Sequence, residues 1–255
     1  MAADEAAGEA RRPVDAAPRA RVSRLGAMQR MAAERLSRSH LETAPVTLFG
    51  EAECDAFVAL REKLNADRAA GERYSFTHLL VKLLAQALRE HPQMNCALID
   101  GSLHLYESVN LGVALALPDG NLVVPVVKDA GRKPLGEVAR EFRELEARAA
   151  AGKLALADVS GGTFTLSNAG MVPGARWTTP IVVTPQCAIL GTGAMRRAPV
   201  VRGERIEAAW LMPTSLTFDH RAVNGVPASR FVETVHGLLG APERVDFGLQ
   251  GSDRE

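Results

Sequence analysis

The sequence lacks long apolar runs, and it has few cysteines. No stretch approaches the ~20 apolar residues of a membrane-spanning helix, and apolar segments such as PIVVTPQCAIL are interrupted by proline. The three cysteines, Cys54, Cys96 and Cys187, are far apart and form no CxxC pair, which argues against a disulfide framework and a zinc site. These absences predict three buried free thiols in a cytoplasmic protein that does not bind membranes.

Several familiar catalytic motifs are also absent. There is no GxxxxGK[ST] phosphate loop, no HExxH and no GxSxG elbow. The glycines of GTGAM (191–195) lack the third glycine of a dinucleotide fingerprint, so they predict a turn at a strand end. Five histidines stand alone, without a second ligand at metal-binding spacing: His40, His78, His91, His104 and His236. We therefore expect no metal site.

The charges of the chain balance. Thirty basic and thirty acidic residues give a formal net charge of zero, so no overall positive field attracts nucleic acid. With 255 residues, 47% of them hydrophobic, the chain is long and apolar enough for a substantial core. The sequence predicts a flexible Ala/Pro/charged leader at 1–20, one domain at 21–247 and a flexible tail at 248–255.

Hydrophobic periodicity predicts a single α/β domain. Helical spacing is found at 21–40, 55–66, 78–91, 133–154 and 228–240. Strand patterns occur at 44–53, 95–129, 161–168, 180–185, 186–193 and 208–220, with hairpin turn signals at Asp100-Gly101 and Asp119-Gly120. The result is a largely antiparallel or mixed sheet flanked by helices. The basic face of 21–40 is either solvated on a packed helix or packed on a partner subunit.

Two polar residues lie at predicted strand ends. The strand 208–220 leads directly into FDHRAVNG, which presents His220 in a polar turn where functional sites are often built. Ser167 ends the polar face of GGTFTLSN, just before a glycine turn. From the residues alone, His220 is a proton-transfer group or a hydrogen-bonded structural histidine, and Ser167 is a ligand-facing hydroxyl or a turn cap.

Five segments in order resemble one enzyme family. FDHRAVNG is similar to the DHRxxDG signature of the acyltransferase component of 2-oxo acid dehydrogenase complexes, which is related to the HHxxxDG motif of chloramphenicol acetyltransferase. The segments 26–36, 109–145, 160–171 and 179–193 resemble the opening helix, the central hairpin and helix, GGTFTISNLG, and TPIxxPPQxxILGxG of the same family. The resemblance covers nearly all of 21–247.

The resemblance implies a fold and a mechanism. The fold would be chloramphenicol acetyltransferase-like, and the activity would be acyl transfer between coenzyme A, as a substrate, and a dihydrolipoyl thiol. His220 would be the general base that takes the thiol proton, and Ser167 would stabilise the oxyanion. The resemblance also implies homotrimers with the active site between subunits, which can assemble further into cubic or dodecahedral cores.

Asn224 stands where the family usually carries an aspartate, which is thought to brace the histidine loop by pairing with an arginine. An asparagine keeps the acceptor oxygen but loses the charge, so we expect a weaker brace and a working enzyme that is slower. None of the five lysines lies in the DKA-type turn of a lipoyl domain. The lipoyl group is therefore expected from a lipoylated protein in trans.

Two alternatives remain open from the sequence. The missing lipoyl turn favours a stand-alone coenzyme A-dependent acyltransferase that acts on a small molecule. Asn224 favours a non-catalytic scaffold of a dehydrogenase complex, whereas the retained His220 and Ser167 argue for catalysis. The sequence specifies neither the acyl group, nor the residues that bind coenzyme A, nor the assembly beyond a trimer.

Overall fold

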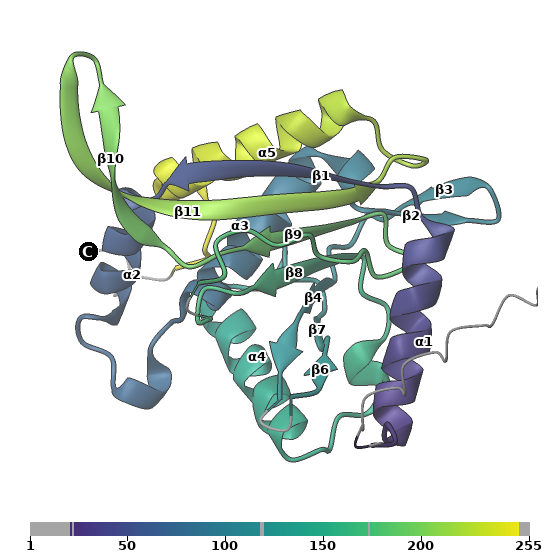
Figure 1. The fold of residues 1–255 in the computed structure, drawn as a ribbon. Helices are drawn as coiled ribbons and strands as arrows, with labels where there is room; N and C mark the ends of the chain where they lie inside the picture. Colours follow the sequence, from purple (N-terminus) through teal and green to yellow (C-terminus); the bar gives the residue numbers. More distant parts are fainter. Residues whose placement is uncertain (1–20, 22, 118–119, 173, 250–255) are drawn as a thin grey trace, which may run out of the picture.

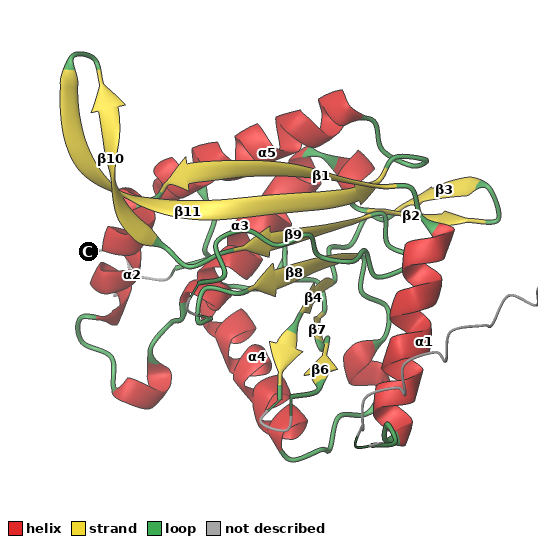
Figure 2. Ribbon diagram, viewed as in Figure 1, coloured by secondary structure: helices red, strands yellow, loops and turns green. Residues whose placement is uncertain are grey.

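The computed structural model of the protein describes residues 21, 23–117, 120–172 and 174–249, and it consists of a mixed sheet with helices packed against it (Figures 1 and 2). The predicted leader, residues 1–20, and residues 250–255 of the predicted tail lie outside the described residues. The helices are α1 (Ala27–Glu42), α2 (Asp55–Asn65), α3 (Phe76–Glu90), α4 (Leu135–Ala150) and α5 (Gly225–Gly240), and short 3-10 turns lie at Ala70–Glu72, Pro92–Met94, Leu156–Val159 and Pro242–Arg244.

Within the described residues, seven strands form the main sheet, in the order β1-β11-β9-β8-β4-β7, with β10 paired to β11. They are β1 (Pro45–Glu53), β4 (Leu111–Val113), β7 (Val126–Val127), β8 (Phe164–Asn168), β9 (Ala188–Thr192), β10 (Arg196–Arg202) and β11 (Arg205–Asp219). The pairs β4–β8 and β8–β9 are parallel, and the other pairs are antiparallel. The predicted mixed sheet is confirmed.

Two separate hairpins follow the predicted turn signals. Strands β2 (Cys96–Ile99) and β3 (Ser102–Leu105) pair across Asp100-Gly101. The φ angles of these two residues are 48° and 75°, as a two-residue type I′ turn requires. Strands β5 (Leu115–Ala116) and β6 (Leu122–Val123) also pair, but Asp119 of the second turn signal lies outside the described residues.

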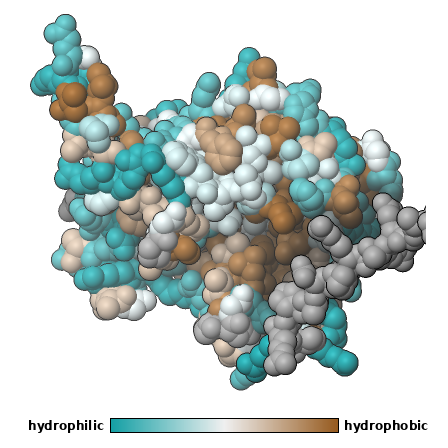
Figure 3. Space-filling view, in the orientation of Figure 1, coloured by the Kyte–Doolittle hydropathy of each residue, from teal (hydrophilic) through white to brown (hydrophobic). Residues whose placement is uncertain are grey.

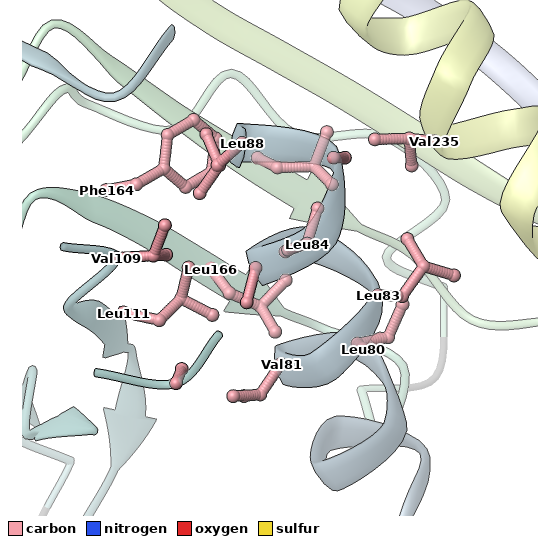
Figure 4. Packing of buried hydrophobic residues seen from close by; sticks show 14 of the residues in the cluster. Leu80, Val81, Leu83, Leu84, Leu88, Val109, Leu111, Phe164, Leu166 and Val235 are labelled. Atoms are coloured by element: carbon pink, nitrogen blue, oxygen red, sulfur yellow. The ribbon is translucent and has the colours of Figure 1, made fainter. Parts of the chain in front are cut away.

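Helix α3 lies in the middle of the apolar core. Its buried leucines Leu84 and Leu88 lie beside Phe164 and Leu166 of β8 (Figure 4). Each fully buried leucine contributes about 2 kcal/mol of hydrophobic free energy relative to exposure. Helices α2 to α5 cover this face of the sheet (Figure 1), so β8 and β11 are anchored on one side by the core.

One predicted strand is absent, and one strand was missed. Residues 180–185 were expected to form a strand, but they form no ladder, because Pro180 and Pro185 lack the N–H donors that pairing needs. This segment instead bonds to α1 and β2: the Val182 carbonyl oxygen accepts from the Ser39 hydroxyl, and the Pro185 carbonyl oxygen accepts from the Leu98 N–H at 3.3 Å. Strand β10, which was not predicted from the sequence, forms a projecting hairpin with the first half of β11 (Figure 1).

Helix α1 exposes its apolar side chains in the single chain. Leu25, just before the helix, is 52% exposed, and Met31 and Leu41 are 69% and 81% exposed. Ser39 is buried, and its hydroxyl donates to the Val182 carbonyl oxygen. Of the two alternatives for 21–40, this exposure favours packing on a partner subunit over a helix packed within its own chain.

Candidate active site

His220 lies in the loop that joins β11 to α5, at one end of the sheet. Its backbone N–H donates to the Ala44 carbonyl oxygen at 2.9 Å, which ties the loop to the start of β1. The ring lies 5.7 Å, centroid to centroid, from the buried ring of Phe218. The side chain is exposed, and among the described residues its ring makes no hydrogen bond. Both ring nitrogens are thus open to a ligand or a second chain.

The His220 loop is braced by the residues on either side of the histidine. The Asp219 carboxylate is buried and accepts hydrogen bonds from the Ala44 N–H at 3.1 Å and from the Arg221 guanidinium at 2.7–3.1 Å. Burial alone raises the pKa of Asp219, but the hydrogen bonds from Arg221 and Ala44 outweigh it and hold this pKa below its usual value. The brace therefore carries a full ion pair at neutral pH.

Asn224 occupies the N-cap position of α5 and is exposed. Its carbonyl oxygen accepts from the Ala228 N–H at 3.2 Å, but its side chain makes no hydrogen bond among the described residues. The resemblance implied a weaker, neutral brace from Asn224, whereas the contacts that hold the loop within the described residues include an ion pair between Asp219 and Arg221. No contact among the described residues thus supports a bracing role for the Asn224 side chain, and this role stays a prediction.

Ser167 lies near the end of β8, on the face opposite the helices. It is half-buried, and its hydroxyl makes no hydrogen bond among the described residues. The turn that follows is capped by Asn168, whose Oδ1 accepts from the Gly170 N–H at 2.9 Å. The capping role that the sequence left open for Ser167 belongs to Asn168, so the Ser167 hydroxyl is free to face a ligand.

Strand register places His220 and Ser167 at opposite ends of the sheet. Ser167 on β8 lies opposite Gly191 on β9, and Gly191 lies opposite Ser215 on β11. His220 follows Ser215 by five residues, which is about 17 Å along a strand, and two strand spacings add about 10 Å across the sheet. The two residues are therefore about 19 Å apart, so one chain does not bring their side chains together.

Other candidate chemistries find little support in the described part of the chain. The three cysteines are free and buried, as predicted. Burial and the nearby Asp55 raise the pKa of Cys54 to about 12, so this thiol stays protonated at neutral pH. Among the described residues, no group of three or more histidine, cysteine, aspartate or glutamate side chains could hold a metal ion, and no helix has the length and apolarity to cross a membrane.

The fold is that of known acyltransferase cores. The dihydrolipoamide acetyltransferase of Azotobacter vinelandii matches with a TM-score of 0.84 and 32% identity, over 92% of this chain and 98% of that chain. The cubic core of a pyruvate dehydrogenase multienzyme complex matches with a TM-score of 0.82 and 33% identity, over 91% of this chain and 96% of that chain. Chloramphenicol acetyltransferase shares the fold at a TM-score of 0.53 and 18% identity, over 81% and 94%. The predicted chloramphenicol acetyltransferase-like fold is confirmed.

Sequence comparison gives the same class of protein. The dihydrolipoyllysine-residue acetyltransferase component of the acetoin cleaving system of Bacillus subtilis is 33% identical over 84% of this chain and 54% of its own length. The succinyltransferase component of the 2-oxoglutarate dehydrogenase complex of Bartonella vinsonii is 36% identical over 89% of this chain and 55% of its own length. Residues 17–246 match the family model of the 2-oxoacid dehydrogenases acyltransferase catalytic domain, so the chain belongs to this family. It spans about half the length of these curated relatives.

The Azotobacter protein also bears on the three predicted site residues. Its structure was determined to investigate the roles of a serine, a histidine and an asparagine in catalysis, and that asparagine follows the histidine by four residues. Asn224 follows His220 by the same spacing. An asparagine at this spacing therefore occurs in at least one relative with a studied catalytic mechanism, which weakens the interpretation of Asn224 as a departure from the family.

Three residues that shape the site were not predicted from the sequence. Asp219 and Arg221 brace His220, and Asn168 caps the turn after Ser167. Each is adjacent to a predicted site residue. A signal was present for Asp219, because a carboxylate at the end of an otherwise apolar strand must find a partner when it is buried.

Proposed function

We propose that the protein transfers acyl groups between coenzyme A and a dihydrolipoyl thiol, as the catalytic core of a 2-oxo acid dehydrogenase complex. The observation that carries this proposal is the pair of free side chains, His220 and Ser167, on the scaffold of an acyltransferase family. A structural histidine or a turn-capping serine would use its side chain to bond its own chain. Neither side chain does so among the described residues.

The proposed mechanism uses one base and one hydroxyl donor. His220 takes the proton from the attacking thiol, and the resulting thiolate attacks the thioester carbonyl carbon. The carbonyl oxygen becomes an oxyanion, which accepts a hydrogen bond from Ser167 Oγ. When the carbon–sulfur bond of the thioester breaks, the departing thiolate takes the proton back from His220. The acyl group has then changed partners, and the histidine is neutral again.

The distance between His220 and Ser167 makes a homotrimer part of the proposal. Because the two residues lie about 19 Å apart in one chain, His220 of one subunit acts with Ser167 of its neighbour. The exposed apolar side chains of α1 supply surface that a neighbour would bury. Figure 3, in the orientation of Figure 1, shows further apolar side chains on the surface of the molecule. The likeness to a cubic core supports further assembly of the trimers.

The lipoyl partner and the cellular location complete the proposal. Lys82 is buried and donates to the carbonyl oxygens of Ala130 and Lys133, and Lys133 pairs with Glu141 at 2.5 Å. These lysines are therefore not available as lipoyl carriers. We propose that a lipoylated protein supplies the acyl group in trans, that no resident metal is used, and that the complex is cytoplasmic.

The direct test is acyl transfer from a panel of acyl-coenzyme A thioesters to free dihydrolipoamide. We expect turnover by the wild-type protein, its loss in His220→Ala, and a ~10–1000-fold lower kcat at similar KM in Ser167→Ala. Ser167→Thr, which keeps a hydroxyl, should stay close to wild type. The acyl group that gives the highest kcat/KM identifies the substrate class.

The same assay separates the proposal from its alternatives. No transfer to dihydrolipoamide, with transfer to small amines, alcohols or thiols, would point to a stand-alone acyltransferase. No transfer to any acceptor by a correctly assembled protein would point to a scaffold. Either result would overturn the proposed function.

A further inference from the structure

The Asn168 carboxamide joins three separate segments directly behind Ser167. Its Nδ2 donates to Thr77 Oγ1 in the first turn of α3 at 3.1 Å. Its Oδ1 accepts from Thr192 Oγ1 at the end of β9 at 3.0 Å and from the Gly170 N–H at 2.9 Å. A single side chain therefore links the end of β8 to the core helix, to the neighbouring strand and to the following turn.

Successive residues of a strand face opposite sides of the sheet, which explains how Asn168 can act on Ser167. Asn168 shares the helix-facing side of β8 with Phe164 and Leu166, both fully buried, whereas Ser167 faces the other side. Helix α3 is the most deeply buried element near this point, so the Thr77 bond ties the strand end to a rigid reference. The hydrogen bond from Asn168 to Thr77 thereby helps to orient the Cα–Cβ bond of Ser167 relative to the core.

The ladder between β8 and β9 ends at Asn168, which lies opposite Thr192. The last ladder contact beyond it is the Ala169 N–H to Thr192 carbonyl hydrogen bond at 2.8 Å. The turn also fits closely around the carboxamide, since a Cβ atom on Gly170 would lie 2.9 Å from Asn168 Oδ1. Strand ends open locally at lower free-energy cost than strand centres. The three Asn168 bonds therefore help to fix the strand end that orients the Ser167 hydroxyl.

We propose that Asn168 is a positioning residue for the Ser167 hydroxyl, an inference that rests on the acyl-transfer function proposed above. An oxyanion donor must lie 2.7–3.1 Å from the place where charge develops. A misplacement of about 1 Å can cost ~10²-fold in rate. The carboxamide does not touch the reacting atoms, so it acts on turnover through Ser167 alone.

The test compares kcat and KM for Asn168→Ala and Asn168→Asp. Asn168→Ala removes all three bonds, and we expect a ~10–100-fold lower kcat with little change in KM for the acyl thioester. Asn168→Asp keeps both acceptor contacts, and the Thr77 hydroxyl can donate to the carboxylate, so most of kcat should return. In a Ser167→Ala background, Asn168→Ala should lower kcat no further, because the two residues act as one unit.

Gln86 provides the matched control. Its carboxamide also joins two segments: Nε2 donates to the Arg244 carbonyl oxygen at 3.0 Å, and Oε1 accepts from the Asp246 N–H at 3.0 Å. It lies on the helix layer and contacts neither His220 nor Ser167. Gln86→Ala should lower Tm without changing kcat. If Asn168→Ala likewise lowered only Tm, the positioning role would be wrong. It would also be wrong if Asn168→Ala lowered kcat by the same factor in the Ser167→Ala background as in the wild-type background.

A failure of the acyl-transfer function would be recognised separately. If the wild-type protein transferred no acyl group, the proposed function would fall, and the crystal structure of Asn168→Ala would decide the positioning claim. A Ser167 hydroxyl displaced by about 1 Å would support it. A hydroxyl in its original place would contradict it.

Discussion

At the scale of single residues, the site depends on polar groups left without partners and on the neighbours that hold them. His220 and Ser167 make no side-chain hydrogen bond among the described residues, whereas Asp219, Arg221 and Asn168 beside them are each paired. The free groups were predictable from motif and strand-end position. The supporting groups were not, because hydrogen bonds such as Ala44 to Asp219 join residues far apart in the sequence.

Substitution of Asn224 tests how the histidine loop is held. Because the Asp219–Arg221 pair already braces His220 within the chain, we expect Asn224→Asp to change kcat by no more than a few-fold. An aspartate at the N-cap position is also favourable for α5, so Tm should hold or rise slightly. Steady-state kinetics with Asn224→Ala alongside would check this. A gain of orders of magnitude in Asn224→Asp would show that the native loop is disabled.

At the scale of secondary-structure elements, local patterns predicted the helices and hairpins. Proline explains the exception at 180–185. Helix α3 ends at Glu90, before His91-Pro92 as expected, and Gly152 follows α4 with φ 65°, where a C′ glycine was predicted. Residues 180–185 read as a strand by composition alone. The two prolines lack ladder donors, and the bonds from Ser39 and Leu98 to this segment join residues far apart in the sequence, which composition does not encode.

The N-terminus of α3 makes the stability of the protein dependent on pH. His78 Nδ1 accepts from the Ser75 N–H at 3.1 Å, and the Ser75 hydroxyl accepts from the His78 N–H at 3.2 Å. Burial, with a smaller contribution from Arg143, lowers the pKa of His78 to about 4. An unfolded histidine titrates near pH ~6.5, so the unfolded chain gains the proton first as the pH falls. This contribution to stability is complete above pH ~6.5 and is lost toward pH ~4.

Replacing His78 by glutamine should remove this pH dependence. Glutamine keeps a side-chain acceptor for the Ser75 N–H, as in an ordinary capping box, but does not titrate. Between pH ~7 and ~4.5, the free energy of unfolding of His78→Gln should fall by about 2 kcal/mol less than that of the wild type. Urea denaturation at several pH values measures this difference. His104→Gln, which changes an exposed histidine, should follow the wild type, and equal pH slopes for wild type and His78→Gln would contradict the prediction.

At the scale of the whole molecule, one chain holds the two proposed catalytic residues far apart. Strand register separates His220 from Ser167 by about 19 Å, and the apolar residues of α1 face outward. Periodicity predicted the α/β class of the domain, and the motifs predicted the fold family and the two site residues, His220 and Ser167. The separation follows from the pairing order β8-β9-β11, which only the three-dimensional structure supplies.

The most direct test of this account is complementation between two variants that each lack one of the two proposed catalytic groups. Chains carrying His220→Ala and chains carrying Ser167→Ala would be coexpressed with different tags, and mixed assemblies isolated through both tags. If subunits share active sites, each mixed trimer has one of its three interfaces with an intact His220 and an intact Ser167, and acyl transfer should return to about a third of wild type. Mixed assemblies no more active than the separate variants, or a monomeric mass for the wild-type protein by light scattering, would contradict the account.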